Sequence, residues 1–119
     1  DMGNTEFDKD DDYPDPAAQV AQKIQQNPKA RGILFCHNGA GVCIVANKFT
    51  GVRAVVTQDA QVAVESKADD DTNVLCLGGG YLSPQAARDI IDQWLQTSFK
   101  DQERYQRRLN KIANLEQTL

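Results

Sequence analysis

Hydrophobic residues are clustered in three short runs along this chain. The runs cover residues 32–36, 53–57 and 73–77, and each is bounded by glycine or polar residues. A short, continuous apolar run is typical of a strand that is buried on both faces, as in a parallel sheet. We therefore predict three strands, of which the first, at residues 32–36, is expected to be buried on both faces.

Apolar residues at helical spacing mark the segments between and after these runs. Asp15 and Ser83 are suited to cap two of the helices, because each precedes a proline that can occupy the first helical position. A loop is expected at residues 69–71. The predicted helices cover residues 16–26, 42–49, 59–67 and 84–95, and a C-terminal helix lies within residues 101–119.

Strands and helices alternate, which predicts an α/β fold with a parallel sheet and right-handed crossovers. The chain has 119 residues, so we expect a single domain over residues 1–119.

Charge and cysteine content narrow the classes of function. A net charge of -4 argues against a general nucleic-acid binder. No run of about 18 apolar residues occurs, so no membrane span is expected. Three cysteines without close pairing indicate free thiols, hence a reducing, cytoplasmic environment. A single histidine and scattered cysteines do not supply a zinc site.

The turn at residues 36–41 is the strongest candidate for chemistry. Its sequence is Cys36-His37-Asn38-Gly39-Ala40-Gly41, and it follows the first predicted strand. Ligands in parallel sheets bind beyond the carboxyl ends of strands, where glycines allow a backbone to approach them. A thiolate here could act as base or nucleophile. The alternative is a buried cysteine ahead of a tight turn, with an incidental His37 and an Asn38 that tolerates an unusual backbone angle.

Two further groups of residues are candidate functional sites, and each also has a purely structural interpretation. Arg104 and Arg108 are four residues apart and share one helix face, where they suit a phosphate or form a solvated face beside Asp101 and Glu103. The acidic run at residues 69–71 is either a solvated loop or a means of placing a carboxylate near Cys36. Cys43 and Cys76 fit the core.

Taken together and in this order, several segments resemble ribose-5-phosphate isomerase type B and the galactose-6-phosphate isomerase subunits. The similarity runs from the start of the chain to about Ile112. The matching segments are residues 13–15, 31–36, 39–41, 46–48, 51–54, 73–78 and 104–108.

The resemblance implies a Rossmann-like three-layer sandwich and aldose–ketose isomerisation of a sugar phosphate through an enediolate, without a metal or organic cofactor. It places Cys36 on the catalytic base and Asp70 on a substrate-binding position. It also implies dimers or tetramers that share active sites, and no nucleic-acid or membrane partner. The loop that holds the anion corresponds to Asn38, Gly39, Ala40 and Gly41, and the phosphate-binding arginines correspond to Arg104 and Arg108.

The chain also departs from the family pattern at the groups that open the sugar ring. Asn38 replaces a threonine and cannot relay a proton as a hydroxyl does. Asp69 replaces a histidine. Either Asp69 acts as the acid, kept protonated by its two acidic neighbours, or His37 takes the role. These changes leave a pentose, tetrose or hexose phosphate open, and the alternative is a non-catalytic sugar-phosphate-binding relative or a partner subunit.

The family begins with a strand and a helix that this sequence does not contain. In that fold the first strand lies inside the sheet, so its absence would leave unpaired backbone groups and an open core. We expect either a longer native protein or another element in the gap. A third interpretation, a flavodoxin-like nucleotide or flavin binder, shares the fold class but lacks the full dinucleotide fingerprint.

Overall fold

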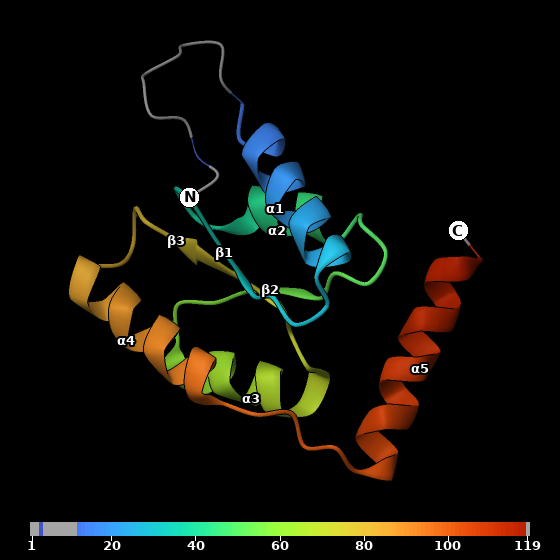
Figure 1. Ribbon diagram of the computed structural model, residues 1–119. Coiled ribbons are helices and arrows are strands. Elements are labelled where there is room, and N and C mark those ends of the chain that lie inside the picture. Colours follow the sequence, from blue (N-terminus) through green and yellow to red (C-terminus); the bar gives the residue numbers. More distant parts are fainter. Residues whose placement is uncertain (1–2, 4–11, 119) are drawn as a thin grey trace.

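Three parallel strands form the centre of the molecule. The computed structural model describes residue 3 and residues 12–118. The strands are β1 (Gly32–Cys36), β2 (Ala54–Val56) and β3 (Val74–Gly78), in the order β1-β3-β2 (Figure 1). All three predicted strands are confirmed to within two residues at each end. Cys36 lies opposite Gly78, so the two longer strands end together at one edge of the sheet.

Helices cover both faces of this sheet, which confirms the α/β three-layer arrangement. α1 (Pro14–Gln26) and α2 (Ala40–Ala46) pack on one face, and α3 (Ala60–Asp70) and α4 (Pro84–Gln96) pack on the other (Figure 1). α5 (Glu103–Gln117) stands beside these layers and contacts α3. Its far end is tied to the body by Glu116, whose carboxylate accepts the Gly51 N–H at 2.7 Å.

Alternate side chains of β3 point to opposite faces of the sheet, and they divide the core into two clusters. Val74 and Cys76 pack toward α1 and α2, whereas Leu75 and Leu77 pack toward α3 and α4. All five residues of β3 are buried, as expected of the central strand. Trp94 of α4 is fully buried in the second cluster.

The start of α1 and the end of α3 differ from the predictions. α1 begins at Pro14 rather than Pro16, because either proline fits the first helical turn. The loop expected at residues 69–71 is wrong for Asp69 and Asp70, which form the last turn of α3. The helix ends only at Asp71, which adopts a left-handed conformation and pairs with Lys67 one turn earlier at 2.6 Å.

α2 is shorter than predicted and has a polar end. It begins at Ala40 rather than Val42, so Ala40 and Gly41 of the predicted turn form its first residues, and it stops at Ala46 rather than Phe49. The next residue, Asn47, accepts the Ala54 N–H at 2.8 Å and donates to the Ala54 carbonyl at 3.0 Å. This amide thereby satisfies the backbone of β2 at its first residue, which a continued helix would not do.

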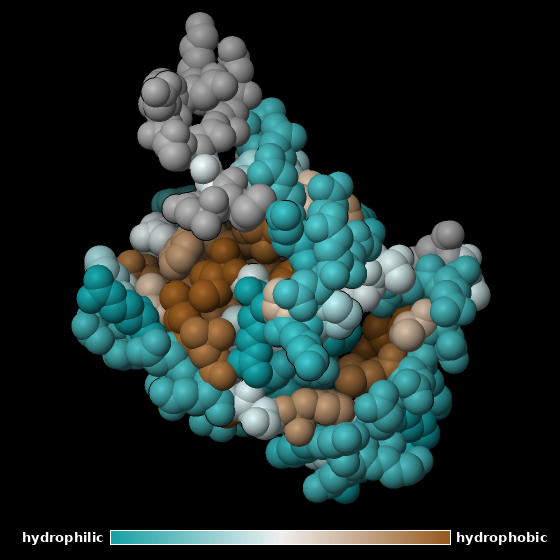
Figure 2. Space-filling view, viewed as in Figure 1, coloured by the Kyte–Doolittle hydropathy of each residue, from teal (hydrophilic) through white to brown (hydrophobic). Residues whose placement is uncertain are grey.

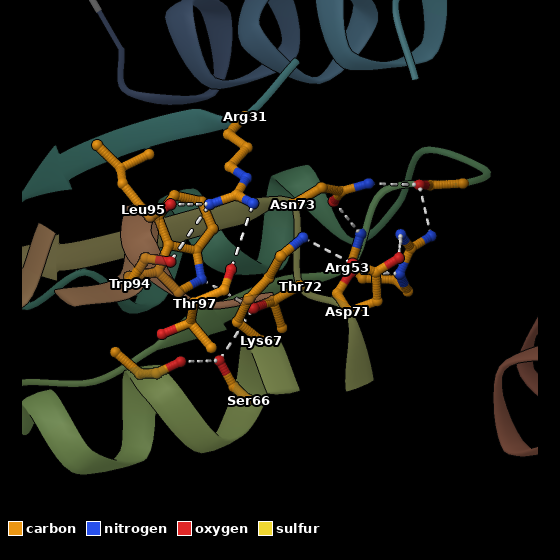
Figure 3. A network of polar contacts seen from close by, with 12 residues as sticks. Arg31, Arg53, Ser66, Lys67, Asp71, Thr72, Asn73, Trp94, Leu95 and Thr97 are labelled. Atoms are coloured by element: carbon orange, nitrogen blue, oxygen red, sulfur yellow. Dashed lines mark hydrogen bonds and ion pairs between the residues drawn. The ribbon is translucent and has the colours of Figure 1, made fainter. Parts of the chain in front are cut away.

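A polar network closes the amino end of the sheet (Figure 3). Asp71 pairs with both Lys67 and Arg53, and the buried Thr72 hydroxyl accepts the Trp94 indole N–H at 3.0 Å. Arg31 donates to the carbonyls at the end of α4, including Leu95 at 2.7 Å. Since these groups satisfy one another, this network has a structural role. The carboxyl end of a parallel sheet is the usual place for a ligand site.

The outer side of β1 forms the edge of the sheet and borders an apolar cavity of about 850 Å³. Side chains of α1 and β1 line it, among them Val20, Leu34 and Phe35. Apolar residues gather on this side of the molecule between α1 and α4 (Figure 2). The open core expected beside the first strand is therefore present, and none of the residues that line this cavity is a predicted site residue. Within residue 3 and residues 12–118, no helix is long and apolar enough to cross a membrane.

Candidate active site

The turn after β1 folds tightly against the end of β3. Gly39 has a left-handed backbone with φ of 81°, and a side chain there would meet Val56 and the backbone of Leu77. Gly78 lies against Asn38, so closely that a Cβ would be 3.0 Å from the Asn38 backbone. Glycine is therefore needed at both positions, one for conformation and one for close approach.

Backbone hydrogen bonds fix this turn in place. The Gly79 N–H donates to the Cys36 carbonyl at 2.8 Å, and the Gly80 N–H donates to the His37 carbonyl at 2.9 Å. The loop after β3 thus holds the first two residues of the predicted site. A rigid support of this kind is what a preorganised reacting group requires.

The Cys36 thiol has a donor aimed at it from within the turn. The Gly39 N–H donates to Cys36 Sγ at 3.1 Å, and the side chain is partly buried against the core beside α1 and α2. A backbone N–H that points at sulfur stabilises negative charge on it. α2 has only seven residues, so this specific donor matters more than the helix dipole.

His37 contacts the loop that leads into α4. Its ring lies against Gly80, and its centroid is 5.3 Å from that of Tyr81, at an interplanar angle of 54°. Cys36, by contrast, packs on the α1 and α2 side of the sheet. The two neighbouring side chains therefore contact different parts of the fold.

The side-chain oxygen of Asn38 is already in use. It accepts the Ala40 N–H at 2.9 Å, a local turn that Asn commonly forms. Its amide nitrogen can still donate to a substrate hydroxyl. Gly41 lies under the Tyr13 ring, where a Cβ would be 2.6 Å from the ring carbons, so Tyr13 borders the predicted anion loop.

A second cluster of predicted site residues lies at the other end of the sheet. Asp69, in the last turn of α3, pairs with Lys100 at 3.2 Å, and the Lys100 N–H donates to the Ala68 carbonyl. The Asp69 carboxylate raises the pKa of Lys100. Asp70 is exposed as the final residue of α3.

Tyr105 lies at the centre of this second cluster. It is buried, whereas Arg104 and Arg108 beside it are exposed. The Arg104 guanidinium donates to the Tyr105 hydroxyl at 3.0 Å. This hydrogen bond is the main reason that the pKa of Tyr105 is lowered.

The two clusters lie at opposite ends of the strands. Cys36 is level with Gly78 at the carboxyl end of β3, whereas Asp69 precedes Val74 at the amino end. The length of β3 alone separates these levels by about 13 Å. Within one chain, the acidic run therefore does not place a carboxylate near Cys36, and the hypothesis that it does so is wrong.

The fold and the turn together define a class, an α/β protein with a thiol at the carboxyl end of a parallel sheet. The sequence profile of the ribose/galactose isomerase family matches residues 1–112. A probable ribose-5-phosphate isomerase B of Mycoplasma pneumoniae is 42% identical over 116 residues, which are 98% of this chain and 76% of that protein. The D-erythrulose-4-phosphate isomerase of Pectobacterium atrosepticum is 39% identical over 88 residues, which are 74% of this chain and 58% of that protein.

Solved structures agree with these sequence matches. Ribose-5-phosphate isomerase B of Mycoplasma genitalium, solved with bound ribulose-5-phosphate, superposes with a TM-score of 0.93 at 38% identity. The match covers 99% of this chain and 78% of that one. The chain belongs to the ribose/galactose isomerase family, and it is an isomerase of the sugar-phosphate class.

Sequence reasoning did not identify Lys100 or Tyr105 as candidate site residues. Lys100 lies between two helices, where helical spacing gives no signal, and Tyr105 has the hydrophobic character of an ordinary core residue. Cys43 and Cys76 are confirmed as buried free thiols, and the hydrogen bond between them and burial raise the pKa of Cys76. Among the described residues, no group of three or more His, Cys, Asp or Glu side chains is placed to hold a metal ion.

Proposed function

We propose that this protein interconverts an aldose phosphate and a ketose phosphate, with Cys36 as the base. The observation that carries the proposal is the hydrogen bond from the Gly39 N–H to Cys36 Sγ at the carboxyl end of β1. The thiolate takes a proton from the carbon next to the substrate carbonyl, which gives an enediolate. The thiol then returns the proton to the neighbouring carbon while the hydroxyl proton moves from one enediolate oxygen to the other, so no cofactor is consumed.

The turn supplies the groups that this step needs beside the base. Its backbone follows a strand end and approaches the site closely, which suits stabilisation of the enediolate oxygens. The free amide nitrogen of Asn38 suits a substrate hydroxyl. In this proposal the enediolate anion is held by the turn residues Asn38, Gly39, Ala40 and Gly41.

Two copies of the chain would complete each site. Arg104 and Arg108 are at the opposite end of the sheet from Cys36, so they reach a substrate at Cys36 only from another copy. Asp69 and Asp70 belong to the same distant end. A two-fold dimer places the base of one copy against the arginines of the other, twice.

The state of the ring-opening positions favours an open-chain substrate. Asp69 is ion-paired with Lys100, and Asn38 carries an amide in place of a hydroxyl that could relay a proton, so neither is set to open a sugar ring. A four-carbon sugar with its phosphate on oxygen 4 cannot close a five-membered ring. We therefore expect D-erythrose 4-phosphate and D-erythrulose 4-phosphate to turn over faster than D-ribose 5-phosphate.

Mixed dimers test the shared site. Cys36→Ala and the double variant Arg104→Ala, Arg108→Ala should each be inactive alone. Co-expressed with different tags, they should recover about one quarter of wild-type activity, because half of the dimers are mixed and each has one intact site. No recovery in purified mixed dimers would refute the shared site, and full exchange of the substrate proton by Cys36→Ala would refute the base.

One rival function is a sugar-phosphate-binding subunit without turnover. The ion-paired Asp69 and the engaged Asn38 are the observations that favour it. Calorimetric binding of four-, five- and six-carbon sugar phosphates, with no turnover of any by the wild-type protein, would establish this rival in place of the isomerase.

A further inference from the structure

Arg104 and Arg108, the arginines predicted to bind phosphate, differ from the neighbouring Arg107 in whether a carboxylate pairs with them. Arg107 pairs with Glu103 at 3.1 Å, as expected of an exposed helix face. Arg104 and Arg108 have no ion pair with a carboxylate among the described residues. Their positive charge is therefore not cancelled by an acidic side chain.

An aromatic ring holds these two arginines instead. The guanidinium carbons of Arg104 and Arg108 are 4.8 and 5.6 Å from the centre of the Tyr105 ring, and Lys100 Nζ is 5.5 Å from it. Tyr105 is only 8% exposed and is the one residue of α5 that is buried. A rigid, buried ring is thus in contact with three flexible cations.

Such an arrangement has a specific physical consequence. Three cations around one point repel each other, and each long side chain loses rotamer freedom when it is fixed. The face of an aromatic ring attracts cations without adding a negative charge, so it orders the side chains and leaves them able to bind an anion. A carboxylate in the same place would order them and neutralise them.

We propose that Tyr105 is a positioning residue, which keeps Arg104 and Arg108 ordered and uncompensated for the phosphate group of the substrate. The inference rests on the proposed function for the identity of that anion. Lys100 has a second task, since it joins the cluster at the ring and pairs with Asp69 at 3.2 Å. Lys100 thereby connects the group of cations around Tyr105 to the Asp69 carboxylate.

Two substitutions of Tyr105 separate the ring from the hydroxyl. Tyr105→Phe keeps the ring and should weaken binding of inorganic phosphate by less than about threefold. Tyr105→Leu removes the contacts to both arginines, each worth a factor of roughly 2 to 5, and should weaken it by about 4- to 25-fold. The Michaelis constant for D-erythrose 4-phosphate should rise in parallel, with kcat nearly unchanged.

Arg107→Gln is the matched control, because it removes an exposed cation that lies on the same helix but pairs with Glu103. It should change phosphate binding by less than about twofold at physiological ionic strength. Far-UV circular dichroism and the melting temperature check that each variant is folded. Since Tyr105→Phe keeps the ring in the buried position, it remains informative if Tyr105→Leu does not fold.

A pH profile gives a readout that a merely structural role would not change. The groups that face Tyr105 are Lys100, Arg104 and Arg108, with Asp69 beside Lys100, and the hydrogen bond from Arg104 lowers the pKa of the phenol. Once the phenol ionises, it holds Arg104 as an ion pair and competes with phosphate. Phosphate affinity of the wild type should therefore fall at a lower pH than an ordinary tyrosine titrates, and that step should be absent in Tyr105→Phe.

Calorimetry with inorganic phosphate keeps this test separate from catalysis. If the wild type binds phosphate and turns over no sugar phosphate, the isomerase proposal fails while the role of Tyr105 is still measured. If folded Tyr105→Leu binds phosphate as the wild type does, or if Arg107→Gln weakens binding as strongly, the positioning role is refuted. An identical pH profile in Tyr105→Phe and wild type would also contradict it.

Discussion

Replacing Gly39 with alanine should lower the free energy of unfolding more than the loss of any one contact on the protein surface. A left-handed backbone costs an alanine about 1–2 kcal/mol. The new Cβ would also lie 2.8 Å from Val56 Cγ2, 3.0 Å from the Leu77 carbonyl carbon and 3.2 Å from the Gly78 nitrogen. Two of these neighbours are backbone atoms in the central strand, so the turn has to move and overpacking adds about 1–3 kcal/mol.

Gly51 supplies a matched control for the backbone cost. It has almost the same conformation, with φ of 84° against 81° for Gly39, but a Cβ there would meet nothing within 4 Å. Gly51→Ala should therefore lose only the backbone contribution of about 1–2 kcal/mol. The difference between the two variants isolates the packing contribution.

Thermal and urea unfolding measure that difference. For a chain of this size, 1 kcal/mol corresponds to roughly 4 °C in melting temperature. Gly39→Ala should melt about 8–20 °C below wild type, and Gly51→Ala about 4–8 °C below it. Equal losses in the two variants, within about 0.5 kcal/mol, would refute the claim that the turn is tightly packed on the end of β3.

Two further predictions concern stability away from the turn. Thr72→Val leaves the buried Trp94 N–H without its acceptor, so it should lower the free energy of unfolding by about 1–3 kcal/mol in urea titrations. The control Thr118→Val, at an exposed helix end, should change the free energy of unfolding by less than about 0.5 kcal/mol. Asp69 raises the pKa of Lys100 above 10.5, so this pair stabilises the fold below that pH and the benefit disappears as pH rises through the folded-state pKa. The difference in unfolding free energy between wild type and Lys100→Gln should therefore shrink between about pH 9 and pH 12, and a difference that grows with pH would contradict the assignment.

Local chemistry made most of the fold predictable. The continuous apolar runs indicated all three strands, but only the central strand β3 is buried on both faces. The expectation that residues 32–36 are buried on both faces is wrong, because β1 is an edge strand and exposes Phe35. Ser83 and Pro84 gave the start of α4, where the Ser83 hydroxyl accepts the Ala86 N–H at 3.1 Å. The extent of α3 was not predictable in this way, because its last turn depends on ion pairs of Asp71 with Lys67 and Arg53.

The candidate site also has one part that the sequence indicates and one part that it does not. The turn at Cys36 could be found from sequence because its residues are contiguous. The cluster around Tyr105 could not, because Lys100 reaches the ring from the segment between α4 and α5. The sequence also did not show the partners of the acidic run, because Asp71 is paired with Arg53 and Lys67, and Asp69 with Lys100.

Compensation of charge separates structural from functional polar groups in this protein. Beside the amino end of the sheet, Arg53 and Lys67 each have the Asp71 carboxylate as a partner, and this network holds the fold together (Figure 3). Arg104 and Arg108 face an aromatic ring instead, and Cys36 faces a backbone N–H. Groups held in place without an opposite charge retain most of their electrostatic interaction for a ligand. The sequence shows which residues are charged, but only the folded chain shows which charges are left for a ligand.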